Sequence, residues 1–493
     1  MKYPILLLTL VLGLAQCTSS QKTYKKAAEL SPETNDIVAE IEKVNVVMGS
    51  AVYESGVRPQ QFDNFVELKK VATKEELETL LIYPNPVVRC YAFWAVQRDT
   101  TVDLLPLLIA HVDDTEEIKT QFGCIGGLEK VGDVMINAVV SMNDSSEQGR
   151  KNRSKLRQLD SILLFRPNNL ATKAWAINRA KPIESNYRRI RQLAIDEHNQ
   201  EALVKLSEYR KRQDIELILN NAETNGENSD RDFFTYEAIA NFPDSAFLPL
   251  LKNRLYAIPD GDHYNNVWLQ LYRAIASFQN DETAELIAIP LTRFKNSEIR
   301  KYHLNYVFSA IGEFNAPIYD NLLWQLWEKD LRINTKTFKY LWKKDSARAI
   351  ATTYKSLNNL EEFSAANQDF GTFPSEDGQG ICSVMLAKML SEDSTHAKKI
   401  ISYYIGVADV HIFPIFSSYA SKMKNVAFIQ PLLERLKMES NPYVYLSATE
   451  ALLSYHNERI NQEIKAAIKS NDNLRKGWGG ESLTKLLKEN GLN

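Results

Sequence analysis

The residue types that carry acid–base or metal chemistry are scattered along this 493-residue chain. No two histidines have the i, i+4 spacing with which one helix presents two ligands to a metal ion. The seven are His111, His198, His263, His303, His396, His411 and His456. His303 and His411 lie in stretches of helical pattern, where a core or surface role is the favoured interpretation. The sequence therefore predicts neither a metal site nor a catalytic histidine.

Two loops have some features of ligand-binding loops. Residues 260–266, DGDHYNN, are rich in oxygen ligands but lack the later glycine and the bidentate glutamate of a calcium loop, so a plain turn is favoured. Residues 371–380 contain three glycines, but no Lys-Ser/Thr pair follows, which argues against a phosphate-binding loop. With Phe370, Phe373 and Pro374, this loop is better suited to be a hydrophobic lid. We expect no cofactor and no enzymatic activity.

The N-terminal residues have the pattern of a secretory signal. The apolar run from Ile5 to Leu14 is too short to span a membrane, which takes about 20 residues, so residues 1–16 are expected to be a signal peptide. The following Leu-Ala-x-Cys resembles the bacterial lipoprotein box, although Gln16 stands where a small residue is usual. This resemblance implies lipidation of Cys17. Thr18 then implies the outer membrane, with the protein facing the periplasm or the surface. Cleavage after Ala15, which leaves a soluble protein, is the alternative.

Three cysteines remain once Cys17 is set aside: Cys90, Cys124 and Cys382. An odd number cannot form a complete set of disulfides. Cys90 and Cys124 are close enough in sequence to pair, but three buried, unpaired thiols are the favoured interpretation, because cysteine packs as a small apolar residue.

Charge is distributed unevenly along a chain of globular composition and formal net charge −3, which argues against a dedicated nucleic-acid binder. Residues 149–214 contain sixteen Lys or Arg and seven Asp or Glu, whereas residues 101–148 contain two and nine. The basic segment is suited to an anionic partner, a lipid headgroup or a second copy of the chain, although solvated helix faces are the simpler interpretation. Its candidate partner-binding residues are Arg150, Arg153, Arg157, Arg188, Arg189, Arg191, Arg210 and Arg212.

A helical pattern recurs through the chain. Apolar residues at Val88, Ala92, Ala95 and Val96 have the spacing of one buried helical stripe, and an Asn-Pro pair precedes them. The same pattern begins at nine positions, and neighbouring ones lie about 30 to 33 residues apart. They are Val88, Ile118, Ala202, Phe234, Val267, Ile299, Ile381, Ile412 and Val444. Strand signals are scarce, so the sequence predicts an all-α chain of repeated helical hairpins.

The repeat resembles the short bacterial HEAT repeat, also called the phycobilisome-lyase-like HEAT repeat. The resemblance is carried by residues 85–89 (NPVVR) with Ala92, 114–119 (DTEEIK) and 296–300 (NSEIR), and more weakly by 441–445 (NPYVY), where Tyr445 replaces the basic residue. It implies an α-solenoid over residues 71–493, with capping helices at 32–70. The lipoprotein-box resemblance implies a lipidated tether at 17–31. Arg89, Lys119 and Arg300 follow the stripe start and are expected to bond turn carbonyls or the preceding Asp or Asn, and so to join one repeat to the next.

Two functions follow as expectations. The favoured one is a lipid-anchored envelope scaffold that binds another envelope protein through the groove of the solenoid. The alternative is a carrier or sensor of an envelope lipid or glycan, with its pocket in the aromatic region 302–342. Trp324, Trp327 and Trp342 lie there, and core packing is their default interpretation.

Overall fold

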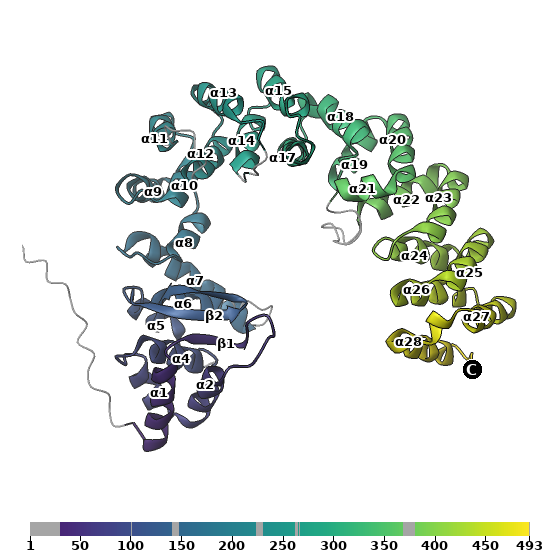
Figure 1. The fold of residues 1–493 in the computed structure, drawn as a ribbon. Coiled ribbons are helices and arrows are strands. Elements are labelled where there is room, and N and C mark those ends of the chain that lie inside the picture. The colour runs from purple at the N-terminus through teal and green to yellow at the C-terminus, as the bar shows by residue number, and fades with distance from the viewer. Residues whose placement is uncertain are drawn as a thin grey trace, which may run out of the picture. The chain divides into compact units, whose positions relative to one another are not determined.

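The computed structural model describes residues 30–99, 101–140, 147–222, 230–261, 265, 267–367 and 380–492. The chain divides into two compact units, Met1–Tyr209 and Arg210–Asn493. Both consist mostly of α-helices, and the first also contains a small sheet (Figure 1). The predicted signal peptide, Cys17 and almost all of the tether lie outside the described residues.

Asparagine side chains start many of the helices. Asn85, Asn199, Asn296 and Asn441 each cap a helix, and each side-chain oxygen accepts a hydrogen bond from an N–H group of the first turn. This bond satisfies one of the donors that a helix start leaves free. Each of these four residues lies three positions before one of the predicted stripe starts, so the cap sets the phase of the buried face.

The first unit contains ten helices and three strands among its described residues. The helices are α1 (Pro32–Val44), α2 (Gln60–Val71), α3 (Lys74–Leu80), α4 (Pro86–Val96), α5 (Leu104–Ala110), α6 (Val131–Val140), α7 (Glu147–Phe165), α8 (Lys173–Arg179), α9 (Glu184–Asp196) and α10 (Gln200–Ser207). The strands are β1 (Val47–Val52), β2 (Glu117–Gly123) and β3 (Ile125–Lys130), in the order β1-β2-β3. β1 runs parallel to β2, and β2 and β3 form an antiparallel hairpin.

The sheet packs on α4 through aromatic side chains. The Tyr91 hydroxyl lies 2.8 Å from the Met48 N–H group, which donates to it, and so joins α4 to β1. The Tyr91 ring stacks on Phe65 of α2, and Trp94 contacts Phe122 of β2. These contacts hold a strand from early in the chain beside a hairpin some 70 residues later.

The prediction of an all-α chain is therefore wrong at one repeat. Ile118 does not start a helix but lies in β2, where it is 3% exposed, while Ile125 of the supposed stripe is 77% exposed. The physical reason is a two-residue alternation, in which Ile118 and Thr120 are buried while Glu117 and Lys119 are exposed, as in a strand with one buried face. The hairpin turns at Gly123, whose φ of 57° favours glycine, rather than at an Asn-Gly pair.

The other predicted stripe starts all lie in helices or at their first turn. In α4 the stripe residues Val88, Ala92, Ala95 and Val96 are buried, which confirms the pattern. The corresponding residues of α26 (Pro442–Leu453), namely Val444, Ala448, Ala451 and Leu452, are buried as well. In α1 the buried residues include Val38 and Ile41.

The second unit is a succession of helices that pack on their neighbours along the chain. They are α11 (Ile215–Asn221), α12 (Asp230–Asn241), α13 (Leu248–Ala257), α14 (Val267–Ala276), α15 (Asp281–Ala288), α16 (Pro290–Arg293), α17 (Ser297–Phe314), α18 (Asp320–Asp330), α19 (Thr335–Lys344), α20 (Ser346–Asn358), α21 (Leu360–Ala366), α22 (Ile381–Glu392), α23 (Ser394–Val407), α24 (Phe413–Met423), α25 (Ile429–Met438), α26, α27 (Glu458–Ser470) and α28 (Gly477–Glu489).

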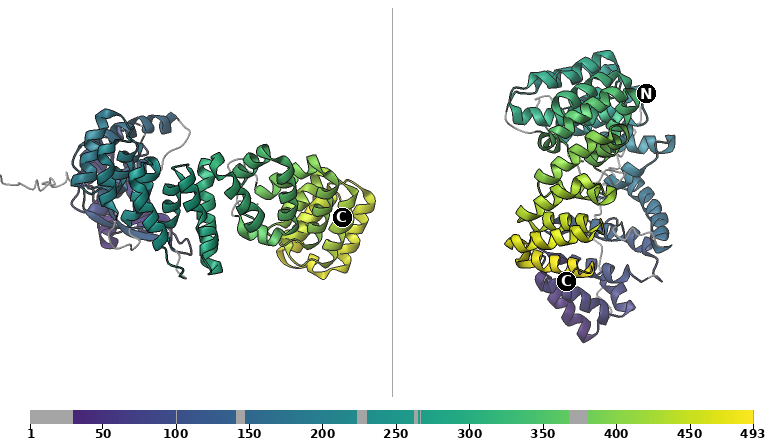
Figure 2. Two further views of the ribbon diagram at one scale, coloured as in Figure 1. Left: turned by 90° about the horizontal axis from the view of Figure 1, so that it is seen from above. Right: turned by 90° about the vertical axis from the view of Figure 1, so that its right-hand side faces the viewer.

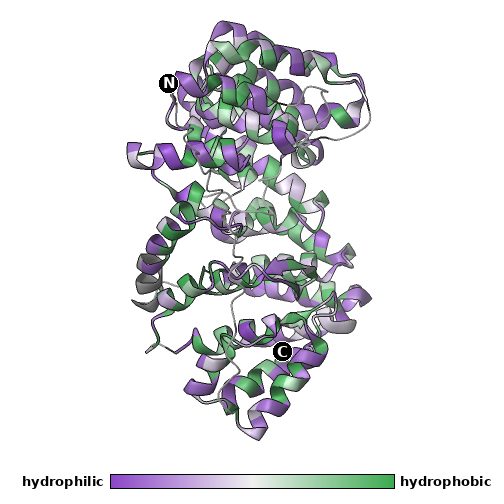
Figure 3. Ribbon diagram, turned by 90° about the vertical axis from the view of Figure 1, so that its left-hand side faces the viewer, coloured by the Kyte–Doolittle hydropathy of each residue, from purple (hydrophilic) through white to green (hydrophobic). Residues whose placement is uncertain are grey.

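Alternate helices of this unit contact one another, as expected for stacked hairpins. α12, α14 and α17 pack in sequence, as do α24, α26 and α28, while α23, α25 and α27 form a second row. Figure 2 shows the stacked pairs from α23 to α28, and Figure 3 shows hydrophobic and hydrophilic residues alternating along the helices. α25 and α27 each bury one face, whereas most residues of α14 are buried between its neighbours.

Side chains from later helices bond the free carbonyl groups at the ends of earlier ones. Arg293 donates to the carbonyls of Leu255, Tyr256 and Ile258 at the end of α13. Arg435 of α25 donates in the same way to Gly406 and Ala408 at the end of α23. Because the last turn of a helix leaves its carbonyls unpaired, these bonds join one hairpin to the next.

His303 is a core residue between α14 and α17, not a ligand. Its ring stacks between Phe294 and Trp268, with centroid distances of 3.6 and 4.2 Å. Its Nδ1 atom lies 2.7 Å from the Tyr272 hydroxyl. Burial, followed by the charge of Arg293, lowers the pKa of His303 to about 4. His411, by contrast, lies exposed in the turn before α24.

The lowered pKa of His303 predicts a loss of stability in acid. The unfolded chain binds one more proton than the folded chain between about pH 6.5 and pH 4, so folding stability falls as the pH decreases through this window. The loss is on the order of 3 kcal/mol over the whole window. We expect the urea midpoint to fall less between pH 7 and pH 5 in His303→Phe than in the wild type or in His411→Ala. Equal falls in all three would contradict the assignment.

Candidate functional site

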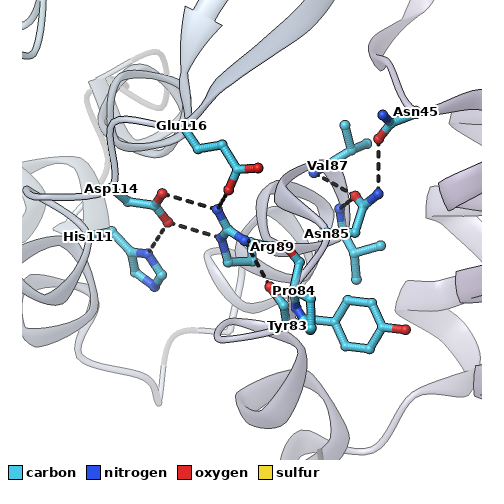
Figure 4. Close-up of polar contacts among 10 residues, drawn as sticks. Asn45, Tyr83, Pro84, Asn85, Val87, Arg89, His111, Asp114 and Glu116 are labelled. Carbon is cyan, nitrogen blue, oxygen red and sulfur yellow. Dashed lines mark hydrogen bonds and ion pairs between the residues drawn. The ribbon is translucent and has the colours of Figure 1, made fainter. Parts of the chain in front are cut away.

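A buried arginine links the end of α3 to the start of the hairpin (Figure 4). Arg89 of α4 is fully buried, and its guanidinium contacts Asp114 through Nε at 3.0 Å and Nη2 at 3.1 Å. Nη2 also donates to Glu116, and Nη1 donates to the carbonyls of Tyr83 and Pro84. The Arg89 side chain thus joins α4 to the turn before it and to the segment before β2, and we call this cluster the Arg89 lock.

The electrostatics of this lock favour a charged Asp114. Burial alone raises the pKa of a carboxyl group, but the hydrogen bond from His111 and the charge of Arg89 outweigh it and lower the pKa of Asp114. Arg300 has the same role in the second unit, since it pairs with Asp330 and donates to the Leu291 carbonyl. Both arginines bond backbone carbonyls that precede them in the chain, as predicted, but their acidic partners are later residues rather than the preceding Asp or Asn. Lys119 lies exposed on β2 and does not start a helix.

A partly open cavity lies between the hairpin, α6 and α8. Its volume is about 300 Å³, close to the lower limit for small-ligand sites. The side chains that matter to its chemistry come from β2, β3, α6 and α8: Glu117, Glu129, Lys130, Asp133, Asn137 and Trp175. None of these residues follows from the sequence patterns described above, because the strands that bring them together were not predicted.

Some polar groups of the cavity lining have hydrogen-bond partners and others have none. Asp133 is buried and accepts bonds from the backbone of Ala171 and from both the backbone and hydroxyl of Thr172, so it caps the start of α8. Glu129 accepts from the Thr120 hydroxyl at 2.8 Å and from the Asn137 amide at 3.3 Å. The Asn137 side-chain oxygen is buried without a hydrogen-bond partner.

The arginines predicted to bind a partner differ in exposure and in their bonds within the protein. Arg189 donates to the Leu164 carbonyl at the end of α7 and contacts Glu197, and Arg210 donates to the Asn241 carbonyl, so both are engaged within their own units. Arg212 is exposed, 3.6 Å from Asp244. Arg157 on α7 and Arg188 on α9 are exposed, and Arg191 is partly buried. The side chains of Arg150 and Arg153 on α7 lie outside the described residues.

Part of the charge in the basic segment is neutralised by the acidic segment before it. Lys155 pairs with Asp103 at 2.9 Å, and Arg166 pairs with Asp113 at 3.2 Å. The acidic segment and the basic segment therefore form ion pairs with each other within the first unit. This pairing reduces the charge that the segment presents to a partner.

Most of the tryptophans and cysteines singled out in the sequence lie in the core, as predicted. Trp324 and Trp327 are buried and stacked on each other, and the Trp327 indole N–H donates to Ser356, while Trp342 is partly exposed. Cys90 and Cys382 are buried free thiols. Cys124 is also free but exposed at the turn of the hairpin, so its predicted burial is wrong. The lid segment around Phe370 and residues 371–379 lies outside the described residues.

Large apolar side chains are exposed along one edge of the last hairpins. Val407 ends α23 and Met438 ends α25, while Tyr443 and Trp478 are the second residues of α26 and α28. Because the ends of one row of helices meet the starts of the other, these four residues lie on the same edge of the stack, which we call the apolar edge. Their exposed fractions are 55%, 78%, 65% and 52%.

Two glycines allow the aromatic pair of the apolar edge to form. A Cβ atom at Gly479 would lie 2.0 Å from the Tyr445 hydroxyl and 2.7 Å from Pro442, and one at Gly480 would collide with the Arg475 backbone. Only glycine therefore lets α28 approach α26 this closely. Trp478, which precedes them, is thereby held 5.2 Å from the Tyr443 ring, measured between centroids. The run GWGG at residues 477–480 was the only sequence signal of this arrangement.

Replacing Arg89 with methionine should destabilise the protein strongly. The substitution leaves the Asp114 carboxylate buried without its cation, which typically costs about 3 to 5 kcal/mol. The matched control is Arg58→Met, because Arg58 pairs with Asp63 at 2.6 Å on the surface, where a pair contributes about 1 kcal/mol or less. Urea unfolding of both variants measures the difference. Similar losses in the two would show that Arg89 is not a lock.

Comparison with known proteins identified no relative of this chain. No protein-family model matches the chain, and no curated protein or solved structure is significantly similar to it. Among the described residues, no group of three or more histidine, cysteine, aspartate or glutamate side chains is placed to hold a metal ion. No helix in the described part of the chain is long and apolar enough to cross a bilayer. The resemblance to HEAT repeats stays a prediction.

Proposed function

We propose that this protein is a lipid-anchored scaffold of a bacterial envelope that binds a partner protein. The apolar edge is the observation that carries the proposal. Water-exposed apolar side chains of this size are costly when they gather, and tryptophan, tyrosine and methionine are the types enriched at protein interfaces. The Tyr443–Trp478 pair is held in place before any partner arrives, so little side-chain freedom is lost on binding.

The arrangement of the hairpins supports a binding role. We propose that the stacked pairs of the second unit form an α-solenoid of HEAT-like repeats, in which each hairpin depends on its neighbours for burial. The partly buried Arg300–Asp330 pair and the arginine bonds to helix-end carbonyls keep successive hairpins in register. A rigid stack presents its surface residues at fixed spacing. The proposed contact surface is this edge of the helix ends, rather than the concave groove that the repeat pattern implied.

Lipid attachment at Cys17 would place the scaffold at a membrane surface. The proposal rests on the signal-like residues 1–16 and the lipoprotein-box resemblance. The alternative, a carrier of a lipid or glycan with its pocket at residues 302–342, is weaker, because Trp324 and Trp327 are used in packing between helices.

Removal of the apolar edge should abolish partner capture. We expect full-length protein, purified from detergent-solubilised envelopes, to retain one protein partner in stoichiometric amount. The double variant Tyr443→Ala/Trp478→Ala should lose at least about 90% of it, since two interface aromatics together contribute several kcal/mol. Tyr256→Ala is the matched control, because Tyr256 is also a half-exposed tyrosine at a helix end of the same unit.

The outcomes of this capture experiment are distinct. Capture that persists in the double variant removes the apolar edge from the proposal. A lipid or glycan that co-purifies in place of any protein supports the carrier instead. Melting temperatures of all three proteins must agree within a few degrees, so that lost capture reports on the surface and not on unfolding.

The exposed part of the basic segment gives a second expectation. Arg157→Glu/Arg188→Glu should weaken capture of the same partner several-fold, and more at low salt, if that partner is acidic. Both side chains are exposed, so the melting temperature should not fall. Arg189→Glu is the contrasting variant, because it removes the bond to the Leu164 carbonyl and should lower stability. Unchanged capture in the double variant would exclude these arginines from the interface.

A further inference from the structure

The cavity beside the hairpin has unused hydrogen-bond acceptors. The Asn137 side-chain oxygen is buried and has no partner. Its orientation is fixed by chemistry, because the amide nitrogen must face the Glu129 carboxylate, to which it donates. The Glu117 carboxylate, at the start of β2, has no hydrogen bond or ion pair to another described residue, although its backbone pairs with Lys130 in the sheet. The cavity therefore offers two carboxylate groups, whereas the Asn137 oxygen is covered within the lining.

The donors of the same cavity are already engaged. The Lys130 amino group donates to the Asn169 carbonyl at 2.6 Å. The Thr172 hydroxyl donates to Asp133 at 2.8 Å. With Lys130 as the one basic residue against Glu117, Glu129 and Asp133, the lining has a net formal charge of −2. A ligand with N–H donors and a positive charge would therefore be complementary to this lining.

One wall of the cavity is an indole ring. Trp175 lies on α8 and is 39% exposed. No aromatic neighbour covers it among the described residues, which distinguishes it from Trp94, Trp324 and Trp327. The face of an indole attracts an ammonium or guanidinium group, and the attraction increases as the cation loses water.

We propose that this cavity, formed by Glu117, Glu129, Asn137 and Trp175, binds an organic cation, an alkylammonium or guanidinium group. The two carboxylates accept its N–H bonds, and the Trp175 ring covers its other side. A volume of about 300 Å³ accommodates one lysine or arginine side chain, or a segment of a polyamine. If the protein binds a partner as proposed above, a basic side chain of that partner is the natural occupant; this last step rests on the proposed function.

Small probes test the cavity without any partner. The full chain is titrated calorimetrically with N-acetyl-arginine methylamide and N-acetyl-lysine methylamide, and with the neutral N-acetyl-citrulline and N-acetyl-norleucine methylamides. We expect at least one cationic probe to bind about 10-fold or more tightly than its neutral counterpart, and to weaken as salt is raised. Equal binding of charged and neutral probes, or no detectable binding of any probe at tens of millimolar, overturns the proposal.

Three variants locate the binding. Glu117→Gln should weaken the cationic probe about 10-fold, and Trp175→Leu about 5-fold, because each removes one of the two attractive elements. Glu78→Gln is the matched control, since Glu78 is an exposed glutamate on α3 of the same unit. Binding that is unchanged in both cavity variants would place the cation elsewhere and overturn the assignment. Glu117 is exposed, so its variant should keep the wild-type melting temperature.

The source of the cation is settled by two further measurements. Tighter binding of spermidine than of either amino-acid probe identifies a free polyamine, and the reverse order identifies a protein side chain. Loss of probe binding together with loss of partner capture in Glu117→Gln places the cavity in the partner interface. Loss of probe binding with capture intact leaves the cation site valid but separate from it, so the two proposals fail independently.

Discussion

The protein depends on how the free polar groups at its helix ends are paired. Each helix leaves carbonyl groups unbonded in its last turn, and short helices have many ends for their length. Here arginine and asparagine side chains from following elements bond those carbonyls, as Arg435 does at the end of α23 and Asn471 at the end of α25. The same bonds that satisfy a buried group also fix the next hairpin against the last one. The need to pair the helix-end carbonyls therefore also determines how successive hairpins stack.

The first unit meets that constraint with a sheet. Where the helical repeat would continue at Ile118, β2 pairs with β1 and β3 instead, and Arg89 is held between α3 and the segment that leads into the hairpin. The strands end beside α6 and α8, and the cavity lies at this junction. The sheet that interrupts the helical repeat is thus also where the proposed cation site lies.

The two candidate binding surfaces differ in chemistry and in unit. The cavity of the first unit presents acceptors and an indole face, whereas the apolar edge of the second unit presents large side chains held by glycine-permitted packing. The proposed ligand of the cavity is a charged group, and the proposed partner of the apolar edge is an apolar surface.

Local chemistry determined the helical part of the protein. The caps at Asn85 and Asn441 and the stripes that follow them act within one helical turn or one helix face, so the sequence alone predicts these helices and their buried residues. Only the tertiary structure decided the rest. Ile118 matched the helical template by spacing, but pairing with a strand 70 residues earlier made it a strand, and such pairing is not encoded locally. The cavity residues and the apolar edge likewise come from separate elements, and their proximity exists only after those elements have packed.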